Sequence, residues 1–381
     1  MAIGIVSYSH TNFGVLKEDI PELVKGVVEG AISKVDKGID PKEIDLIVTS
    51  CVDNQFSNQH QTGTLAWRYL KNPDAKGFKV EAACASGSLA LFVAREMVRA
   101  GFVKNAMIVG FEKMSNIPTD KVTSILIRGG SPEERMIGIT QPAAYGFMAK
   151  LYMEKYGATE DDYALVAVKN HDNAMRNPWA QFHKKITIED VKGSKMIASP
   201  IRLLHCSPIT DGAAAIILSG EPKRYTDTPV YIKSMAVAHD TLGVFERADP
   251  TFLSASKKAA DEAYMKAGLK PSQIQFAEVH DAFAPAEIQL YDALGFSGKG
   301  EGYRLIRDNA TAFSGSRPVN VSGGLKAKGH PIGATGVGMM IETFLQLRGE
   351  AGERQLPSPE IGLIENHGGT GAVAAVAILG R

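Results

Sequence analysis

The two halves of this sequence follow the same structural pattern. Residues 38–45 (GIDPKEID) are echoed by residues 268–275 (GLKPSQIQ), and each copy stands between a helical pattern and an apolar strand. Apolar residues at i, i+3 and i+4 spacing predict these helices at residues 23–35 and 259–267. A long-range repeat of this kind indicates two similar units that pack together.

Each unit alternates strands with helices. Strands are predicted at residues 78–82 and 320–322, before buried helices at 89–98 and 337–345, and apolar Gly/Ala-rich strands close the two halves at 211–218 and 370–379. This alternation predicts an α/β fold with helices on both faces of its sheets. We therefore expect an N-terminal half over residues 1–220 and a C-terminal half over residues 221–381.

A segment at about residues 117–208 interrupts the symmetry. It contains several prolines and short helical patterns at residues 145–153 and 162–168. Long excursions from a core usually form lids or binding loops. We expect this insertion to serve the functional site.

Composition narrows the class of protein. The 381 residues carry 42 Lys+Arg and 42 Asp+Glu, so no excess charge points to nucleic acid or to an anionic membrane. No apolar run approaches the roughly 18 residues that cross a bilayer. Cys51, Cys84 and Cys206 are widely spaced, which argues against a disulfide framework and a metal site. We expect a soluble, cytoplasmic protein with no metal in this chain.

Cys84 lies between the predicted strand 78–82 and the predicted helix 89–98. Unpaired N–H groups and the dipole at a helix N-terminus stabilise a negative group, and thiolates in such places have lowered pKa values. Cys84 is therefore a candidate nucleophile. The alternative is a small buried cysteine that packs the corner.

Three histidine loops occupy comparable positions in the second half. His330 stands between Gly329 and Pro331 on a tight turn, which favours a functional role over a core histidine. His280 and Asp281 follow an apolar strand, where α/β proteins bind ligands, although a hydrogen bond that ends the strand explains them equally well. Asn366 and His367 precede Gly368 and two further glycines, whose unobstructed N–H groups suit an oxyanion hole or a plain hairpin turn.

Together these four loops resemble the catalytic loops of the thiolase superfamily, over nearly the whole chain. Cys84-Ala85-Ser86 matches the family's Cys-x-Ser motif, Gly329-His330-Pro331 its Gly-His-Pro motif, and His280-Asp281-Ala282-Phe283 the variant His-Asp-x-Phe motif. Asn366-His367-Gly368 stands where many thiolases have Cys-x-Gly, as in the archaeal and sterol-carrier-protein-type branches. The resemblance implies two duplicated βαβαβ halves in a five-layer α-β-α-β-α fold with an inserted loop domain.

The resemblance also implies a reaction, the CoA-dependent cleavage of a 3-oxoacyl-CoA or the reverse condensation. Cys84 would carry the acyl group, and His330 would activate the Cys84 thiol. The N–H groups of Cys84 and Gly368 would stabilise the alkoxide. Because the second cysteine of many thiolases is missing, the residue that acts as general acid and base is not fixed by the motifs. Asn366 cannot titrate, so His367 is expected in that role, with His280 as the fallback if His367 points away from Cys84. Asp281 is expected to support the site, and coenzyme A is a substrate whose binding residues stay unassigned.

The resemblance further implies a homodimer and, for this branch, a small zinc-ribbon OB-fold partner protein. Some members of the branch act on aryl substrates such as benzoylsuccinyl-CoA. Two other readings stay open. Ketoacyl synthases and hydroxymethylglutaryl-CoA synthases share the duplicated fold, and a non-catalytic acyl-CoA-binding scaffold would keep the fold without the chemistry.

Overall fold

The computed structural model describes residues 2–52 and 54–381. Within these residues, nine strands join in the order β3-β2-β4-β7-β1-β8-β11-β10-β9. Their bounds are β1 (Gly4–His10), β2 (Leu46–Ser50), β3 (Lys76–Lys79), β4 (Asn105–Glu112), β7 (Gly212–Ser219), β8 (Val230–His239), β9 (Phe276–Val279), β10 (Ile361–Gly368) and β11 (Val373–Gly380). A separate hairpin consists of β5 (Met196–Ala198) and β6 (Ile201–Arg202).

The strand order confirms the duplication. In the first half, β3, β2 and β4 are parallel, β7 pairs antiparallel with β4, and β1 pairs antiparallel with β7. In the second half, β9 and β10 are parallel, and β11 and β8 continue the sheet in the same way. The halves meet at the β1–β8 pairing, which consists of two residue pairs, Gly4–Tyr231 and Ile5–Val230.

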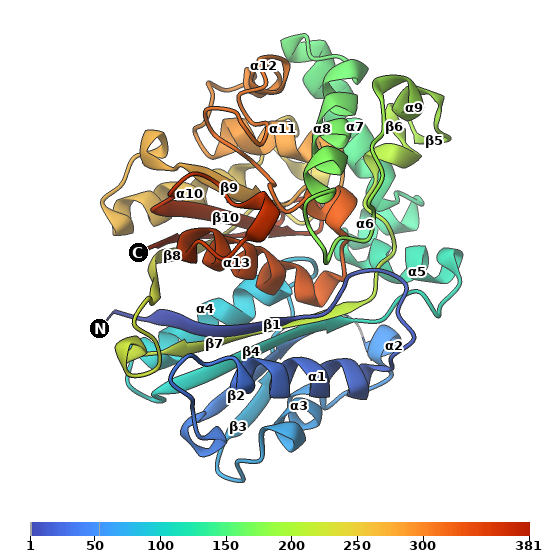
Figure 1. Ribbon diagram of the computed structural model, residues 1–381. Helices are drawn as coiled ribbons and strands as arrows, with labels where there is room; N and C mark the ends of the chain where they lie inside the picture. Colours follow the sequence, from blue (N-terminus) through green and yellow to red (C-terminus); the bar gives the residue numbers. More distant parts are fainter. Residues whose placement is uncertain (1, 53) are drawn as a thin grey trace.

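Helices cover both faces of each half, which gives the five layers (Figure 1). The first half is covered on its outer face by α1 (Ile20–Ser33) and α3 (Thr62–Leu70), and the second half by α10 (Ser254–Ala267). Between the two halves lie α4 (Ser86–Arg99) and α13 (Ile332–Arg348), which contact each other and the strands around them. The apolar stripe predicted for residues 23–35 is the buried face of α1.

Glycines allow α4 and α13 to approach closely. A Cβ atom at Gly336 would lie 2.5 Å from the backbone nitrogen of Ser88, and one at Gly87 would lie 3.0 Å from the backbone nitrogen of Val337. Side chains at these positions would force the two helices apart. Both helices begin at the loops that carry the chemistry, so this contact brings the two loops together.

The strand predicted at residues 320–322 was wrong. One parallel bridge joins Val319 to Ala277, at the place where β3 pairs with β2 in the first half. Asn320 has a positive φ of 57°, which turns the chain away from the sheet, and its side-chain oxygen accepts the Val279 N–H at 2.8 Å. The Asn320 side chain therefore takes the place of the backbone carbonyl group that would accept the next hydrogen bond of the ladder.

The insertion is helical. The patterns predicted at residues 145–153 and 162–168 belong to longer helices, α7 (Gln141–Tyr156) and α8 (Glu160–Ala174). The remaining helices are α2 (Asn54–Ser57), α5 (Thr119–Leu126), α6 (Pro132–Met136), α9 (Ile188–Gly193), α11 (Ala284–Ala293) and α12 (Gly302–Arg307). Among the described residues, no helix combines the length and the apolar character that a membrane crossing needs.

Candidate active site

Cys84 lies at a sharp corner between β3 and α4. Ala83 has a φ of +49°, a left-handed conformation that an alanine adopts at a cost of about 1 kcal/mol. The Ser86 hydroxyl donates to the Ala83 carbonyl oxygen at 2.6 Å and accepts the Ala82 N–H at 2.8 Å. These bonds fix the turn that presents the thiol just before the first residue of α4.

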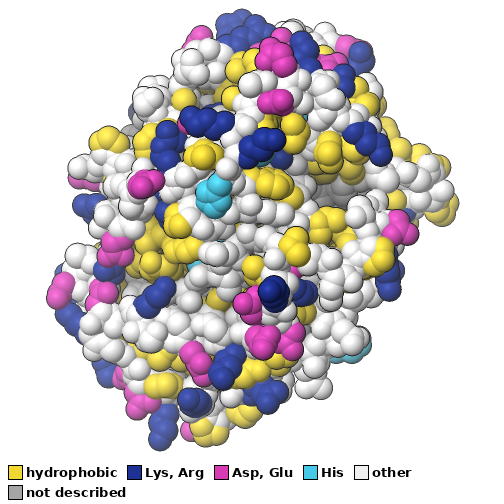
Figure 2. Space-filling view, turned by 45° about the vertical axis from the view of Figure 1, so that its right-hand side comes forward, with side chains coloured by type: hydrophobic (Ala, Val, Ile, Leu, Met, Phe, Trp, Pro, Cys, Tyr) yellow, Lys and Arg dark blue, Asp and Glu magenta, His cyan; other side chains and the backbone are white. Residues whose placement is uncertain are grey.

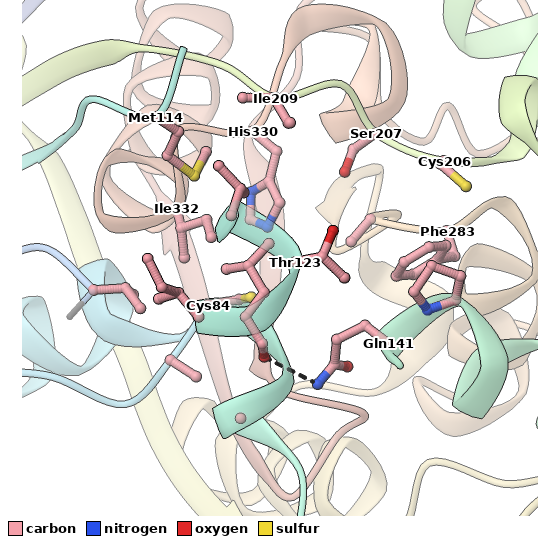
Figure 3. A pocket seen from close by; sticks show the side chains of 18 of the residues that line it. Cys84, Met114, Thr123, Gln141, Cys206, Ser207, Ile209, Phe283, His330 and Ile332 are labelled. Atoms are coloured by element: carbon pink, nitrogen blue, oxygen red, sulfur yellow. Dashed lines mark hydrogen bonds between the residues drawn. The ribbon is translucent and has the colours of Figure 1, made fainter. Parts of the chain in front are cut away.

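A cavity of about 570 Å³ lies in front of Cys84. Its wall is mainly apolar and combines residues of the insertion with residues of both halves, among them Met114, Val122, Leu126, Ile209, Phe283 and Ile332. Figure 3 shows the Cys84 sulfur and the His330 ring on one side of this space and Cys206 on the other. On the face shown in Figure 2, hydrophobic side chains gather around a hollow in the surface.

Two histidines from the second half meet Cys84 at the cavity wall. The Cys84 sulfur and one ring nitrogen each from His280 and His330 all lie within 4.8 Å of one another. The two rings are in edge contact, with their centroids 5.1 Å apart. The structure thus joins three of the four predicted loops at one point.

The hydrogen bonds of His330 define its tautomer. Its Nδ1 lies 2.6 Å from the Thr335 hydroxyl oxygen, and that hydroxyl donates its own proton to the Pro331 carbonyl oxygen at 3.1 Å. The Thr335 oxygen therefore accepts the Nδ1 proton of His330. Nε2 is then left without a proton, as a base requires.

The hydrogen bonds of Asn366 define the tautomer of His280. The Asn366 side-chain oxygen accepts from the Ser88 hydroxyl at 2.9 Å, and its NH₂ group donates to the Cys84 carbonyl oxygen at 3.1 Å. The same NH₂ group lies 2.9 Å from Nδ1 of His280, which must therefore accept. The His280 proton is on Nε2, which is buried and has no hydrogen-bond partner among the described residues.

The pKa of the Cys84 thiol is opposite to the sequence expectation. Burial raises this pKa to about 12, and hydrogen bonds from the Gly369 and Cys84 N–H groups oppose the rise. A helix N-terminus contributes about 0.3–1 kcal/mol. Cys84 is partly buried at the cavity wall, and the rise of its pKa to about 12 corresponds to roughly 4 kcal/mol, so desolvation outweighs the helix.

Both histidines at the cavity are neutral. Burial and, to a smaller extent, the charge of His367 lower the pKa of His330 to about 3. Burial, as the main cause, lowers the pKa of His280 well below its usual range, and the neighbouring His367 adds to this effect. The site therefore holds a neutral thiol between two neutral imidazoles.

The backbone donor at the thiol is Gly369 rather than Gly368. Gly369 lines the cavity, and its N–H is hydrogen-bonded to the Cys84 side chain. Gly368 is the last residue of β10, where its carbonyl oxygen accepts the N–H groups of Gly371 and Ala372. The expected donor therefore moves by one residue.

His367 lies beside the cavity histidines but does not line the cavity. The sequence placed residues 365–368 in a loop, whereas β10 continues through Gly368. Successive side chains of a strand point to opposite faces, and Asn366 takes the face toward Cys84. Nδ1 of His367 lies 3.1 Å from a Glu365 carboxylate oxygen, and Nε2 lies 2.8 Å from the Tyr145 hydroxyl. Both ring nitrogens are thus engaged by protein groups.

Asp281 points away from the cavity and supports the loop that carries His330. Its carboxylate accepts the N–H groups of Leu325 at 2.6 Å and Lys326 at 3.3 Å, together with the Asn170 amide at 2.6 Å. Leu325 and Lys326 belong to a π-helical turn (Gly324–Lys328) just before Gly329 and His330. Asp281 thereby connects the His280 and His330 loops.

The comparisons with known proteins agree with this geometry. The model of the thiolase N-terminal domain matches residues 3–222, and the model of the thiolase C-terminal domain-like family matches residues 236–381. The chain belongs to the thiolase family. An acetyl-CoA acetyltransferase of Methanothermobacter thermautotrophicus is 41% identical over all of this chain and 99% of that protein. Human sterol carrier protein 2 is 36% identical over 76% of this chain and 56% of that protein.

Solved structures share the thiolase fold with this chain. An Ltp2-ChsH2(DUF35) aldolase has a TM-score of 0.85 at 24% identity and covers 100% of this chain and 98% of its own. Human mitochondrial 3-ketoacyl-CoA thiolase has a TM-score of 0.76 at 16% identity, again over 100% of this chain and 98% of its own. As a thiolase with full-length acetyltransferase relatives, this protein is an acyltransferase enzyme.

Several residues that shape this thiolase site had no predicted role. Thr335 lies in the first turn of α13, where a hydroxyl can reach back to His330. Glu365 lies two residues before His367 on β10, so the period of a strand could have indicated that they share a face. Tyr145 comes from the insertion, and no pattern in the sequence relates it to the other loops.

Cys84, His280 and His330 are also side chains that could bind a metal ion. Two imidazoles and a thiol are donors that Zn²⁺ accepts, and the sulfur and nitrogen atoms lie within 4.8 Å of one another. The expectation that this chain holds no metal therefore stays a prediction.

Proposed function

We propose that this thiolase catalyses the CoA-dependent cleavage of a 3-oxoacyl-CoA, or the reverse Claisen condensation, through an acyl-enzyme on Cys84. The observation that supports it most is the meeting of Cys84, His280 and His330 within 4.8 Å at the wall of a cavity. A nucleophile with an adjacent base splits one difficult bond cleavage into two easier steps.

In the first step, Nε2 of His330 takes the proton of the Cys84 thiol, and the thiolate attacks the 3-oxo carbon. The resulting alkoxide accepts hydrogen bonds from the N–H groups of Cys84 and Gly369, the two backbone donors at the sulfur. Loss of one such donor costs roughly 3–4 kcal/mol of barrier in comparable enzymes. The neutral imidazole tautomer of His330 supports its assignment as the base.

In the second step, the bond between C2 and C3 breaks, and its electron pair stays on the leaving acyl-CoA as an enolate. The acyl group remains on Cys84 as a thioester. Nε2–H of His280, which no group in residues 2–52 and 54–381 accepts, donates to the enolate oxygen. His330 then delivers to C2 the proton that it took from Cys84, so the departing acyl-CoA is neutral.

In the third step, the thiol of CoA gives its proton to His330 and attacks the thioester carbonyl. The bond between that carbon and the Cys84 sulfur breaks, and Cys84 recovers the proton from His330. The cycle uses His330 as the proton carrier, because Asn366 occupies Nδ1 of His280 and both nitrogens of His367 are engaged. His367 then acts through its neighbours.

We further propose a bulky acyl substrate, with aryl compounds such as benzoylsuccinyl-CoA as candidates. The cavity of about 570 Å³ and its apolar wall support this choice. Phe283 offers a flat surface for a ring. Filling the wall with Val122→Trp should lower activity on benzoylacetyl-CoA while activity on acetoacetyl-CoA persists. Equal losses on both substrates would contradict a bulky acyl group.

We also propose a homodimer that works with a small zinc-ribbon OB-fold protein. β3 ends the sheet on one side, so its outer edge offers backbone groups to a second copy. The structural neighbour in which Ltp2 is combined with the DUF35 protein ChsH2 supports a second protein. Light scattering of the purified chain, alone and after coexpression with the candidate partner, would test both.

The decisive experiment compares reactions. Cleavage of acetoacetyl-CoA or benzoylacetyl-CoA by CoA, with release of acetyl-CoA, is expected for a thiolase. Condensation that requires malonyl thioesters would favour a ketoacyl synthase, and condensation of acetyl-CoA with acetoacetyl-CoA would favour a hydroxymethylglutaryl-CoA synthase. Absence of an acyl group on Cys84 by mass spectrometry, with no turnover, would favour the scaffold.

A further inference from the structure

Tyr145 of the insertion connects His367 to the glycine turn at the nucleophile. Its hydroxyl donates to the Gly369 carbonyl oxygen at 2.9 Å and lies 2.8 Å from Nε2 of His367. A carbonyl oxygen can only accept, so the tyrosine proton points to Gly369 and His367 donates to the tyrosine oxygen. Burial holds the pKa of Tyr145 well above its usual range, so the hydroxyl keeps this proton.

The other end of this chain of hydrogen bonds is equally constrained. Glu365 accepts from the Ser256 hydroxyl at 2.7 Å and from Nδ1 of His367 at 3.1 Å, and both partners are buried. His367 therefore bridges the Tyr145 hydroxyl and the buried Glu365 carboxyl group, which fixes the orientation of its ring.

Gly369 is held from several sides. It has a φ of +62°, and a Cβ atom there would lie 2.7 Å from the Gly129 carbonyl oxygen. Arg247 donates to the carbonyl oxygen of the next residue, Thr370, at 2.7 Å. The Tyr145 hydroxyl donates a hydrogen bond to the Gly369 carbonyl oxygen itself. The N–H of the same residue is directed at the Cys84 side chain and lowers the pKa of the thiol.

We propose that Tyr145 is a positioning residue that aims the Gly369 N–H at the sulfur of Cys84, with His367 and Glu365 orienting the tyrosine hydroxyl. The inference rests on the proposed function, because it assigns that N–H to the alkoxide. It gives His367 a role through Tyr145 in place of acid/base chemistry. It also gives the insertion a part in the chemistry, since α7 supplies Tyr145 and its ring stacks on Phe283 of the His280 loop, with centroids 4.6 Å apart.

The test compares two tyrosines of the same helix. Tyr145→Phe removes the hydroxyl at Gly369. Tyr152→Phe removes a hydroxyl that is equally buried but bonds Asp292 at 2.8 Å, and Tyr152 does not line the cavity. We expect kcat for thiolysis to fall about 10- to 100-fold in Tyr145→Phe with KM within about twofold, because a donor is misplaced only where charge develops. Tyr152→Phe should stay within about twofold of the unchanged protein.

A spectroscopic measurement separates positioning from general loosening. The infrared band of a ¹³C-labelled acyl-enzyme carbonyl reports hydrogen bonding to its oxygen. We expect the band of Tyr145→Phe at higher wavenumber than the bands of the unchanged protein and Tyr152→Phe. Equal bands and equal kcat in the two variants would overturn the proposal, as would a raised KM with unchanged kcat. If the unchanged protein forms no acyl-enzyme and shows no thiolysis, the proposed function itself fails.

Discussion

The side-chain NH₂ group of Asn366 lies 2.9 Å from Nδ1 of His280. Because the same group also donates to the Cys84 carbonyl oxygen, the amide cannot be turned without placing two acceptors against each other. Asn366 stands where many thiolases carry a second cysteine. In this chain its NH₂ group faces Nδ1 of His280, which leaves the His280 proton on Nε2.

Asn366→Asp should therefore reverse the tautomer of His280. The carboxylate would accept a proton from Nδ1, which leaves Nε2 without its hydrogen toward the substrate. A comparable change in a serine protease triad lowers kcat about 10⁴-fold, and we expect a loss of at least about 100-fold in kcat. Ser88→Ala is the control, because it removes a bond to Asn366 and leaves the NH₂ group. Steady-state kinetics would measure both, and a similar loss in the two variants would contradict the tautomer argument.

Two cysteines line the cavity, but only Cys84 faces the histidines. We expect Cys84→Ala to lose at least about 1,000-fold in thiolysis, since no group can then carry the acyl chain. Cys206→Ala should keep activity within about threefold, because Cys206 lies across the cavity from His330 (Figure 3). Mass spectrometry after incubation with an acyl-CoA should find the acyl group on Cys84 in the Cys206→Ala variant. An acyl group on Cys206 would contradict the assignment.

The raised pKa of Cys84 predicts how the resting enzyme reacts with iodoacetamide. Only the thiolate reacts, and a pKa of about 12 means that the thiolate fraction grows about tenfold per pH unit across the neutral range. Alkylation of Cys84 in the Cys206→Ala variant should therefore rise steadily from pH 6 to pH 9. A rate that levels off between pH 6 and pH 8 would instead indicate a thiolate with a lowered pKa, as the helix N-terminus alone had suggested.

Alanine substitution should have opposite effects on stability at Gly336, which lies at the contact between α4 and α13, and at Gly26, which lies away from it. At Gly336 an added methyl group would lie 2.5 Å from the Ser88 nitrogen and 2.7 Å from the Asn366 side-chain oxygen, so Gly336→Ala should destabilise the protein by about 3 kcal/mol. Gly26 lies in α1 with nothing within 4 Å of an added methyl group, so Gly26→Ala should stabilise it by about 0.5–1 kcal/mol. Urea denaturation would compare them, and equal midpoints would contradict the close packing.

The fold could be predicted largely from local patterns. The spacing of apolar residues located α1 and α10, and the repeat of residues 38–45 at 268–275 indicated the duplication that the strand order confirms. The failure at residues 320–322 has a local cause that apolar spacing does not encode. Asn320 adopts a left-handed backbone conformation, and its side-chain oxygen accepts the Val279 N–H at the sheet edge. The strand-like run therefore ends after one bridge.

At the site, too, some features could be predicted from the sequence and others could not. Motifs in the sequence identified Cys84, His280 and His330, because glycine, proline and a helix start leave visible signals near each of them. The pKa of Cys84 could not be read from them, since desolvation depends on what the insertion and the second half place around the thiol.

By itself, the sequence determined the duplicated α/β fold and the loops that carry Cys84, His280 and His330, since each of these is marked by a local pattern of residues. The tertiary structure alone decided which histidine faces Cys84. The continuation of β10 through Gly368 turns His367 to the other face of the strand, toward Glu365 and Tyr145, and leaves Asn366 beside Cys84. A strand alternates its side chains residue by residue, so a boundary that local propensity cannot fix exchanges the two roles.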